Sequence, residues 1–187
     1  MLSREMVAEP GRRFEYSGGA TLLLAEILER ATGKPIDAYA REWLFLPLGI
    51  ERFEWRQHIL WGKPLPFSGL RLTPRSMIVV GQLMLDKGVY DGRVLVPAGW
   101  VAQLQQPHVA ATGQGMGYGW QWWVGRIEQG PAAGTGWFGG LGNGGQVLMV
   151  VPELDATVAV TAGRYNSPAS SRPSLAICRR VIEALRV

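Results

Sequence analysis

Two glycine-rich strings are the first candidates for binding chemistry, because each fits the dinucleotide-binding pattern G-x-G-x-x-G. They are residues 134–139, GTGWFG, and residues 140–145, GLGNGG. A dinucleotide fingerprint must follow a strand and open a helix, so that backbone N–H groups at the helix start meet the pyrophosphate. Here the second string leads into residues 147–151, VLMVV, which predict a strand. The sequence therefore argues against dinucleotide binding.

The two histidines and the single cysteine are the next candidates, since histidine is the commonest general base near neutral pH and thiolates bind metals. His58 and His108 lie outside any metal-ligand spacing or nucleophile motif, so we expect ordinary surface or loop residues. Cys178 can form no disulfide within the chain, and we expect it to be buried on the last helix. The chain contains no G-x-S-x-G, which excludes the α/β-hydrolase class. We expect neither a metal nor a cofactor.

The composition is typical of a globular protein, with 187 residues of which 47% are hydrophobic. The net charge of +4 comes from arginines interspersed with acids, which indicates a solvated surface and no nucleic-acid partner. The longest apolar runs, near residues 21–25 and 147–152, are far shorter than the ~20 residues of a membrane-spanning helix. The first residues lack the apolar core of a signal peptide, so the sequence leaves the compartment unknown.

The spacing of apolar residues predicts helices in the first part of the chain. Leu24, Ile27, Leu28 and Ala31 recur at helical spacing over residues 20–32, with Ser17 before them as a possible cap. Further helices are predicted over residues 36–46 and 77–85 and after Pro97. Residues 118–124, 146–151 and 157–161 then predict strands, and residues 173–185 a closing helix. Residues 152–155 are short enough to join the last two strands as an antiparallel hairpin.

Helices followed by a group of strands predict an α+β fold and argue against alternating βαβ units. We expect residues 1–112 to form a helical part and residues 113–187 to form antiparallel strands and a closing helix of the same domain. No internal repeat or low-complexity segment is found.

An ordered series of short motifs resembles the class C β-lactamase-like and penicillin-binding-protein-like serine hydrolases. Residues 10–18, PGRRFEYSG, resemble that group's P-G-x-x-F-x-Y-S-N segment. The later matches are PLGI at 47–50, SGLRLTPR at 68–75, YGWQWW at 118–123, and GLGNGGQ at 140–146, which resembles the glycine-rich H-x-G or K-T-G strand. The series covers nearly the whole chain. It implies a β-lactamase/transpeptidase-like α+β fold, with an antiparallel sheet flanked by helices.

The resemblance also implies the residues of a site for a small-molecule acyl substrate. Tyr16 matches the family's tyrosine, a general base or proton relay, and the backbone N–H of Asn143 matches one of two oxyanion donors. The positions that match substrate contacts are Gly18, Gly140, Leu141 and Gly142, with Trp137 placed before the glycine-rich strand.

Three departures from the family pattern set limits on activity. The family's nucleophile and its lysine form S-x-x-K, and no serine of this chain has lysine three residues later. Gly18 stands in place of the asparagine of Y-x-N, and Gly140 in place of histidine or lysine. We therefore expect the C-terminal part of a serine hydrolase, incomplete at its N-terminus and inactive alone. Its substrate could be an ester, an amide or a β-lactam.

Other interpretations remain open for the same residues. Tyr16 could be a packed aromatic before a helix, and the whole chain could be a non-catalytic domain that binds a ligand or partner. We expect Trp120, Trp122 and Trp123 to be core or sheet residues. Tyr165 and Asn166 follow the last strand near the expected edge of the site. An N-terminally incomplete sheet would expose an edge, so self-association is a further expectation.

Overall fold

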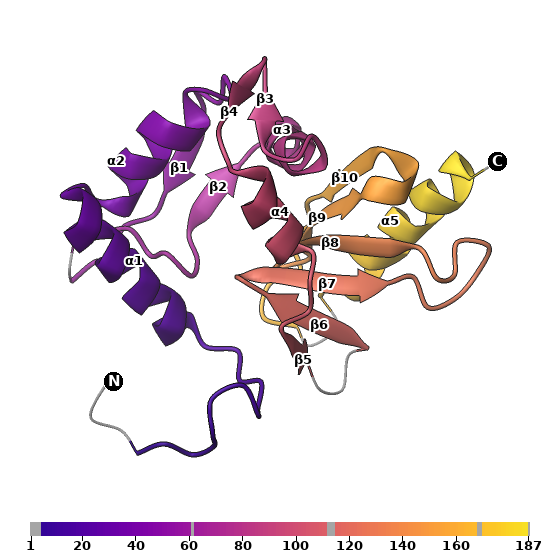
Figure 1. Ribbon diagram of the computed structural model, residues 1–187, viewed down its shortest axis with the longest axis horizontal. Helices are drawn as coiled ribbons and strands as arrows, with labels where there is room; N and C mark the ends of the chain where they lie inside the picture. The colour runs from indigo at the N-terminus through magenta and orange to yellow at the C-terminus, as the bar shows by residue number, and fades with distance from the viewer. Residues whose placement is uncertain (1–4, 61, 112–114, 168–169, 187) are drawn as a thin grey trace. The chain divides into compact units, whose positions relative to one another are not determined.

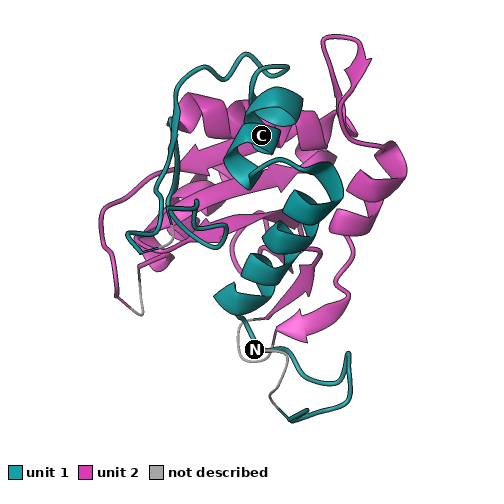
Figure 2. Ribbon diagram, turned by 90° about the vertical axis from the view of Figure 1, so that its left-hand side faces the viewer, with its two compact units in different colours: residues 1–73 teal, residues 74–187 magenta. Residues whose placement is uncertain are grey.

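The computed structural model describes residues 5–60, 62–111, 115–167 and 170–186 of the chain. The chain divides into two compact units, residues 1–73 and residues 74–187 (Figure 2). The six-stranded sheet of the second unit begins at Val109, close to the change from helices to strands that the sequence predicts near residue 112.

The first unit contains three helical segments and a two-stranded sheet (Figure 1). These elements are α1 (Gly18–Thr32), α2 (Ile36–Ala40), the π-helical turn η1 (Arg41–Phe45), β1 (Phe53–Trp55) and β2 (Leu70–Leu72). The helix predicted over residues 36–46 is thus an α-helix that continues as a π-helical turn. Phe45, Leu48 and Ile50 are buried, and the rings of Phe45 and Phe53 lie 4.5 Å apart.

Helix α1 begins and ends where its capping residues predict. Ser17 is in an extended conformation just before the helix. Gly33 has a left-handed φ of 71°, and its N–H donates to the carbonyl of Glu29 at 2.8 Å. Glycine adopts this conformation without a Cβ penalty, so it ends the helix cleanly. Two apolar residues of α1, Leu24 and Ile27, are exposed.

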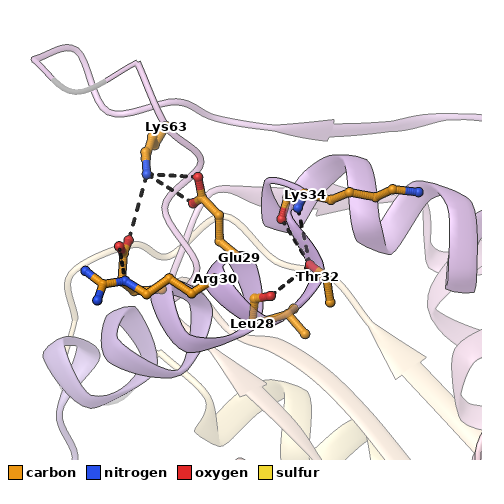
Figure 3. A network of polar contacts seen from close by, with 7 residues as sticks. Leu28, Glu29, Arg30, Thr32, Lys34 and Lys63 are labelled. Carbon is orange, nitrogen blue, oxygen red and sulfur yellow. Dashed lines mark hydrogen bonds and ion pairs between the residues drawn. The ribbon is translucent and has the colours of Figure 1, made fainter.

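A charged network ties α1 to the loop between β1 and β2 (Figure 3). Lys63 Nζ donates to both carboxylate oxygens of Glu29, at 3.0 and 3.1 Å, and lies 3.8 Å from a Glu26 oxygen. The hydrogen bond to Glu29 raises the pKa of Lys63 above its ordinary value. Arg30 Nε donates to Glu26 at 3.1 Å. Because these groups are largely exposed, the network orients the loop and contributes little to stability.

The second unit is built on a six-stranded antiparallel sheet in the order β10-β9-β8-β7-β6-β5 (Figure 1). Its strands are β5 (Val109–Ala111), β6 (Met116–Gly119), β7 (Trp122–Arg126), β8 (Gly136–Gly142), β9 (Gln146–Val151) and β10 (Ala156–Val160). The unit also contains α3 (Pro74–Leu85), the small hairpin β3 (Val89–Tyr90) and β4 (Arg93–Val94), α4 (Ala98–Leu104) and α5 (Arg172–Leu185). The antiparallel sheet flanked by helices agrees with the predicted α+β class.

Helices α3 and α5 cover opposite faces of this sheet. A Cβ added at Gly81 of α3 would lie 2.3 Å from the Thr157 side chain, so α3 packs closely on that face. The neighbouring residue Val158 belongs to a buried cluster with Cys178 and Ile182 of α5. Successive strand residues point to opposite faces, so the sheet forms the middle of three layers.

Cys178 is fully buried in this core, as its place on the last helix predicts. Burial raises the pKa of its thiol to about 11. The thiolate is therefore rare at neutral pH, and Cys178 acts as a small apolar residue.

The strand predicted over residues 118–124 is wrong in one respect, because the chain turns back within it. Trp120 and Gln121 have φ values of 44° and 70° and form the tight turn between β6 and β7. Such turns favour asparagine and glycine, so a tryptophan and a glutamine give no turn signal. The prediction of a strand over 146–151 is confirmed by β9, and β9 and β10 form the predicted antiparallel hairpin.

No helix among the described residues combines the length and the apolar character needed to cross a membrane.

Candidate active site

The first group of predicted site residues lies at the start of α1, in the first unit. Tyr16 immediately precedes the cap residue Ser17, and its side chain is 60% exposed. Gly18 is the first residue of the helix. Both residues therefore lie at the N-terminal end of a regular helix, where the phenol at position 16 is accessible to a small molecule.

Gly18 has no room for a side chain as Phe67 now stands. An added Cβ would lie 2.9 Å from Phe67 Cγ and 3.2 Å from Phe67 Cβ. Real Cβ atoms do not approach so closely, so the ring of Phe67 occupies the space that an asparagine at position 18 would need. Phe67 is a residue of the site region that the sequence analysis did not identify, since no motif marks it.

We expect Gly18→Asn to lower the free energy of unfolding by about 1–3 kcal/mol, the usual cost of overpacking. The measurement is urea unfolding followed by circular dichroism. Phe67→Ala removes the ring with which the new side chain would clash. Gly18→Asn should therefore reduce the free energy of unfolding less when it is made in the Phe67→Ala variant than in the wild type. Equal costs in the two backgrounds would show that Phe67 is not what restricts position 18.

The second group lies on β8 and the turn that follows it, in the second unit. β8 pairs with β9 from Phe138↔Val150 to its last residue, Gly142↔Gln146. On its other side, β8 pairs with β7 only up to Gly139, opposite Trp123. The last three residues, Gly140–Gly142, therefore extend past the paired part of β7. A strand end of this kind can offer backbone N–H and C=O groups to an extended ligand.

Neighbouring glycines of β8 have opposite packing requirements. A Cβ added at Gly139 would lie 1.9 Å from the carbonyl oxygen of Leu148, so the close approach of β8 and β9 requires glycine there. A Cβ added at Gly140 would meet no atom within 4 Å. Gly140 is exposed, so the missing histidine or lysine of the family pattern is not excluded by packing.

Asn143 begins the turn between β8 and β9, just beyond the last paired residues. The two following residues, Gly144 and Gly145, each have a φ of 89°, which strongly favours glycine. The side chain of Asn143 exchanges two hydrogen bonds with Asn166. Asn143 Nδ2 donates to Asn166 Oδ1 at 2.9 Å, and the backbone N–H of Asn166 donates to Asn143 Oδ1 at 2.9 Å.

Trp137 and Leu141 face the interior of the second unit. Trp137 is 5% exposed and belongs to the buried cluster that includes Ile182 of α5. The side chain of Leu141 packs against the same cluster. On this strand, Gly140 and Gly142 point to the opposite face, because side-chain directions alternate. Leu141 can therefore contact a ligand at the strand edge only through its backbone. The buried side chain of Trp137 anchors β8 to the core of the second unit.

Both histidines lie in loops, as predicted, and each has a hydrogen-bond partner. His58 Nδ1 accepts a hydrogen bond from the backbone N–H of Leu60 at 3.2 Å. His108 Nε2 lies 3.1 Å from the carbonyl oxygen of Gln103, and its ring is 4.8 Å from that of Trp120. Trp120 also stacks on Trp100, with ring centroids 5.9 Å apart. These aromatic residues form a surface cluster on the second unit.

Among the residues that the structure describes, no three histidine, cysteine, aspartate or glutamate side chains gather as the ligands of a metal ion would. The chemistry offered by the two groups is thus a phenol at the start of α1 and a set of backbone groups along β8 and its turn.

Known proteins resemble this chain over most of its length. The sequence profile of the Beta-lactamase family matches residues 1–176. A curated relative, 6-aminohexanoate-dimer hydrolase of Paenarthrobacter ureafaciens, is 29% identical over 155 residues, which are 78% of this chain and 38% of the relative.

Solved structures show the same fold. A protein from Bacillus anthracis, provisionally named a 6-aminohexanoate-dimer hydrolase, is 27% identical with a TM-score of 0.80. The match covers 97% of this chain and 47% of that protein. A β-lactamase from Mycobacterium bovis is 22% identical with a TM-score of 0.74, over 98% of this chain and 68% of that one. The chain thus spans less than half the length of the two hydrolases named first.

Proposed function

Because this chain belongs to the β-lactamase family, we propose that it supplies one part of a serine hydrolase site that acts on a small acyl substrate through an acyl-enzyme. The hydrolase names of its relatives and the match across both compact units support this proposal. On the same ground we propose that residues 1–112 and 113–187 are the helical and strand parts of one catalytic domain.

The observation that carries the proposal is the end of β8. Gly140–Gly142 extend past the paired part of β7, and Asn143 follows at the start of a tight turn. In acyl transfer, the carbonyl oxygen of the substrate becomes an oxyanion, and fixed N–H donors stabilise it. We assign one such donor to the backbone N–H of Asn143, and contacts along the substrate to the backbone of Gly140, Leu141 and Gly142.

Tyr16 supplies the acid–base chemistry in this proposal. A serine must lose its proton as it attacks the acyl carbon, and the leaving group must gain one. The phenol of Tyr16 takes and returns that proton. We assign a contact with the substrate to the backbone of Gly18, because the ring of Phe67 fills the space of a side chain there. Trp137 does not contact the substrate in this proposal, and its buried side chain holds β8 in place.

The chain alone is proposed to be inactive, because it contains no S-x-x-K from which a nucleophile could come. A direct test is a hybrid in which this chain replaces the matching part of the Paenarthrobacter hydrolase and the rest of that enzyme is kept. We expect the hybrid to hydrolyse p-nitrophenyl acetate or a chromogenic cephalosporin with a burst, and the chain alone to give none.

The control is the same hybrid with the serine of S-x-x-K replaced by alanine. A folded hybrid without activity beyond this control, against both probes and the 6-aminohexanoate dimer, would count against the proposal. It would favour the second candidate function, a non-catalytic domain that binds a ligand in the same place. Glycine at both positions 18 and 140, where the family has polar side chains, is the observation that favours this alternative.

We also propose that the isolated chain associates with itself along β10. Among the residues that the structure describes, this strand is at the edge of the six-stranded sheet and pairs only with β9. Unpaired strand edges attract further strands, and nothing in the sequence of β10, ATVAV, carries a charge that would prevent this.

The expected result is a mass above the 20.5 kDa monomer in size-exclusion chromatography with light scattering. Ala159→Lys, which places a charge on the edge strand, should shift the mass toward the monomer. Val94→Lys, on the exposed hairpin strand β4, is the matched control and should not. A wild-type chain that is monomeric at all concentrations contradicts the proposal.

A further inference from the structure

The turn that carries Asn143 is held by a segment distant in sequence, residues 162–166, and by α5. The backbone N–H of Arg164 donates to the carbonyl oxygen of Gly144 at 3.1 Å. Ser174 Oγ, which is buried on α5, donates to the carbonyl oxygen of Gly145 at 2.7 Å. These two hydrogen bonds hold the carbonyl groups of Gly144 and Gly145. Neither of them involves Asn143, whose position depends on other contacts.

Asn143 is fixed by the reciprocal pair that it forms with Asn166. The two hydrogen bonds, both 2.9 Å long, join the Asn143 amide group to the side chain and to the backbone of Asn166. Two bonds in different directions restrain both the position and the rotation of residue 143. Asn166 itself has a left-handed φ of 58°, a conformation that asparagine tolerates better than most residues.

The need for such a restraint follows from the turn itself. The N–H of Asn143 belongs to the peptide unit shared with Gly142, the last ladder residue of β8. Glycine restricts the backbone less than other residues do, so the direction of this N–H depends on the contacts that residue 143 itself makes. An oxyanion donor acts only if it is directed beforehand at the place where negative charge develops.

We propose that Asn166 is a positioning residue, which holds the backbone N–H of Asn143 in the direction needed for oxyanion stabilisation. This inference rests on the proposed function. It separates two roles within one residue pair: the backbone of Asn143 meets the substrate, and the side chains of Asn143 and Asn166 keep that backbone in place. Asn143→Ala therefore keeps the backbone N–H of residue 143 and removes the hydrogen bonds that restrain it. Asn166→Ala also keeps this N–H and removes the hydrogen bond between the two side chains.

The first arm of the test uses the 187-residue chain and requires no catalysis. ¹⁵N relaxation is measured for the amide of Asn143 in the wild type, Asn166→Ala, Asn166→Gly and Arg164→Ala. We expect the order parameter of this amide to fall from about 0.85 to below about 0.6 in Asn166→Ala. Asn166→Gly keeps the left-handed backbone and its N–H donor, so an intermediate value is expected. Arg164 contributes through its backbone, so Arg164→Ala should match the wild type.

The second arm uses the active hybrid and a double-mutant cycle. Asn143→Ala and Asn166→Ala should each lower kcat by roughly 10-fold, with KM changed less than about 2-fold, because the restraint matters in the transition state. The double variant should be no slower than either single variant, since both remove the same pair.

An unchanged order parameter in Asn166→Ala overturns the inference, whatever the hybrid does. Additive losses in the cycle, or a loss confined to KM, overturn it as well. An inactive hybrid is a failure of the proposed function, and the relaxation arm then decides by itself whether Asn166 orders residue 143.

Discussion

Replacing Tyr16 by phenylalanine is expected to lower kcat/KM of the hybrid enzyme by about 10²–10⁴-fold, the usual contribution of a positioned acid–base group. The substitution removes one hydroxyl and keeps the ring. Tyr16 is 60% exposed at the start of α1, so the change removes little packing and the hybrid should remain folded. The measurement is the initial rate of p-nitrophenyl acetate hydrolysis over a range of substrate concentrations.

Tyr90→Phe is the matched control, because it removes the same hydroxyl from β3, which is outside both groups of candidate residues. It should leave kcat/KM within about 2-fold of the unmodified hybrid, as expected for a residue without a role in the transition state. A Tyr16→Phe hybrid that is as active as the Tyr90→Phe hybrid would show that the Tyr16 hydroxyl has no acid–base role. The proposed oxyanion donor at Asn143 would be unaffected, but another group would have to supply the acid–base chemistry.

The second large effect concerns stability. Gly139→Ala is expected to reduce the free energy of unfolding by about 3 kcal/mol, at the upper end of overpacking costs. The added methyl group would meet the Leu148 carbonyl at 1.9 Å and the Leu148 carbonyl carbon at 2.9 Å. Both atoms belong to the backbone of β9, so no side-chain rotation relieves the clash. The loss is a large share of the 5–15 kcal/mol that stabilises a typical domain.

Gly140→Ala is the control for this prediction, one residue along the same strand. Its methyl group would meet no atom within 4 Å. Stability should stay the same or rise by up to about 1 kcal/mol, because alanine restricts the unfolded chain more than glycine does. Thermal unfolding of both variants provides the measurement. Equal losses at the two positions would mean that strand propensity, and not the contact with β9, determines the cost.

The helices could be predicted from the sequence because their signals are local. Gly33 ends α1, Pro74 opens α3, and apolar residues recur at helical spacing between such boundaries. The same applies to β9, a run of six residues without glycine. Local signals of this kind place an element even when its neighbours in space are unknown.

Local sequence patterns did not predict the glycine-rich strand β8, because four of its seven residues are glycine, and only the family resemblance implied a strand at its end. Glycine has low intrinsic strand preference, so β8 depends on its place between β7 and β9. The turn at Trp120 and Gln121 could not be predicted for a related reason. Tertiary contacts, including the stacking of Trp120 on Trp100, accompany a backbone conformation that the residue types disfavour.

The candidate site was identified from motif order, and the structure adds what motifs do not contain. Phe67 beside Gly18 and Ser174 beneath Gly145 come from segments distant in sequence. Asn166 was placed near the site edge by sequence, but its pairing with Asn143 depends on how β10 returns the chain. Such contacts are set by topology, and composition or spacing cannot reveal them.

The open space at Gly140 also bears on how this protein could change under selection. Every glycine codon becomes an arginine codon through a change of its first base, so a cation can enter position 140 in one mutational step. That step costs little stability, because no neighbouring atom has to move. At position 139 a side chain is resisted by the backbone of β9. In a randomised library, new affinity for an anionic substrate group should therefore arise repeatedly at position 140 and hardly ever at its neighbour.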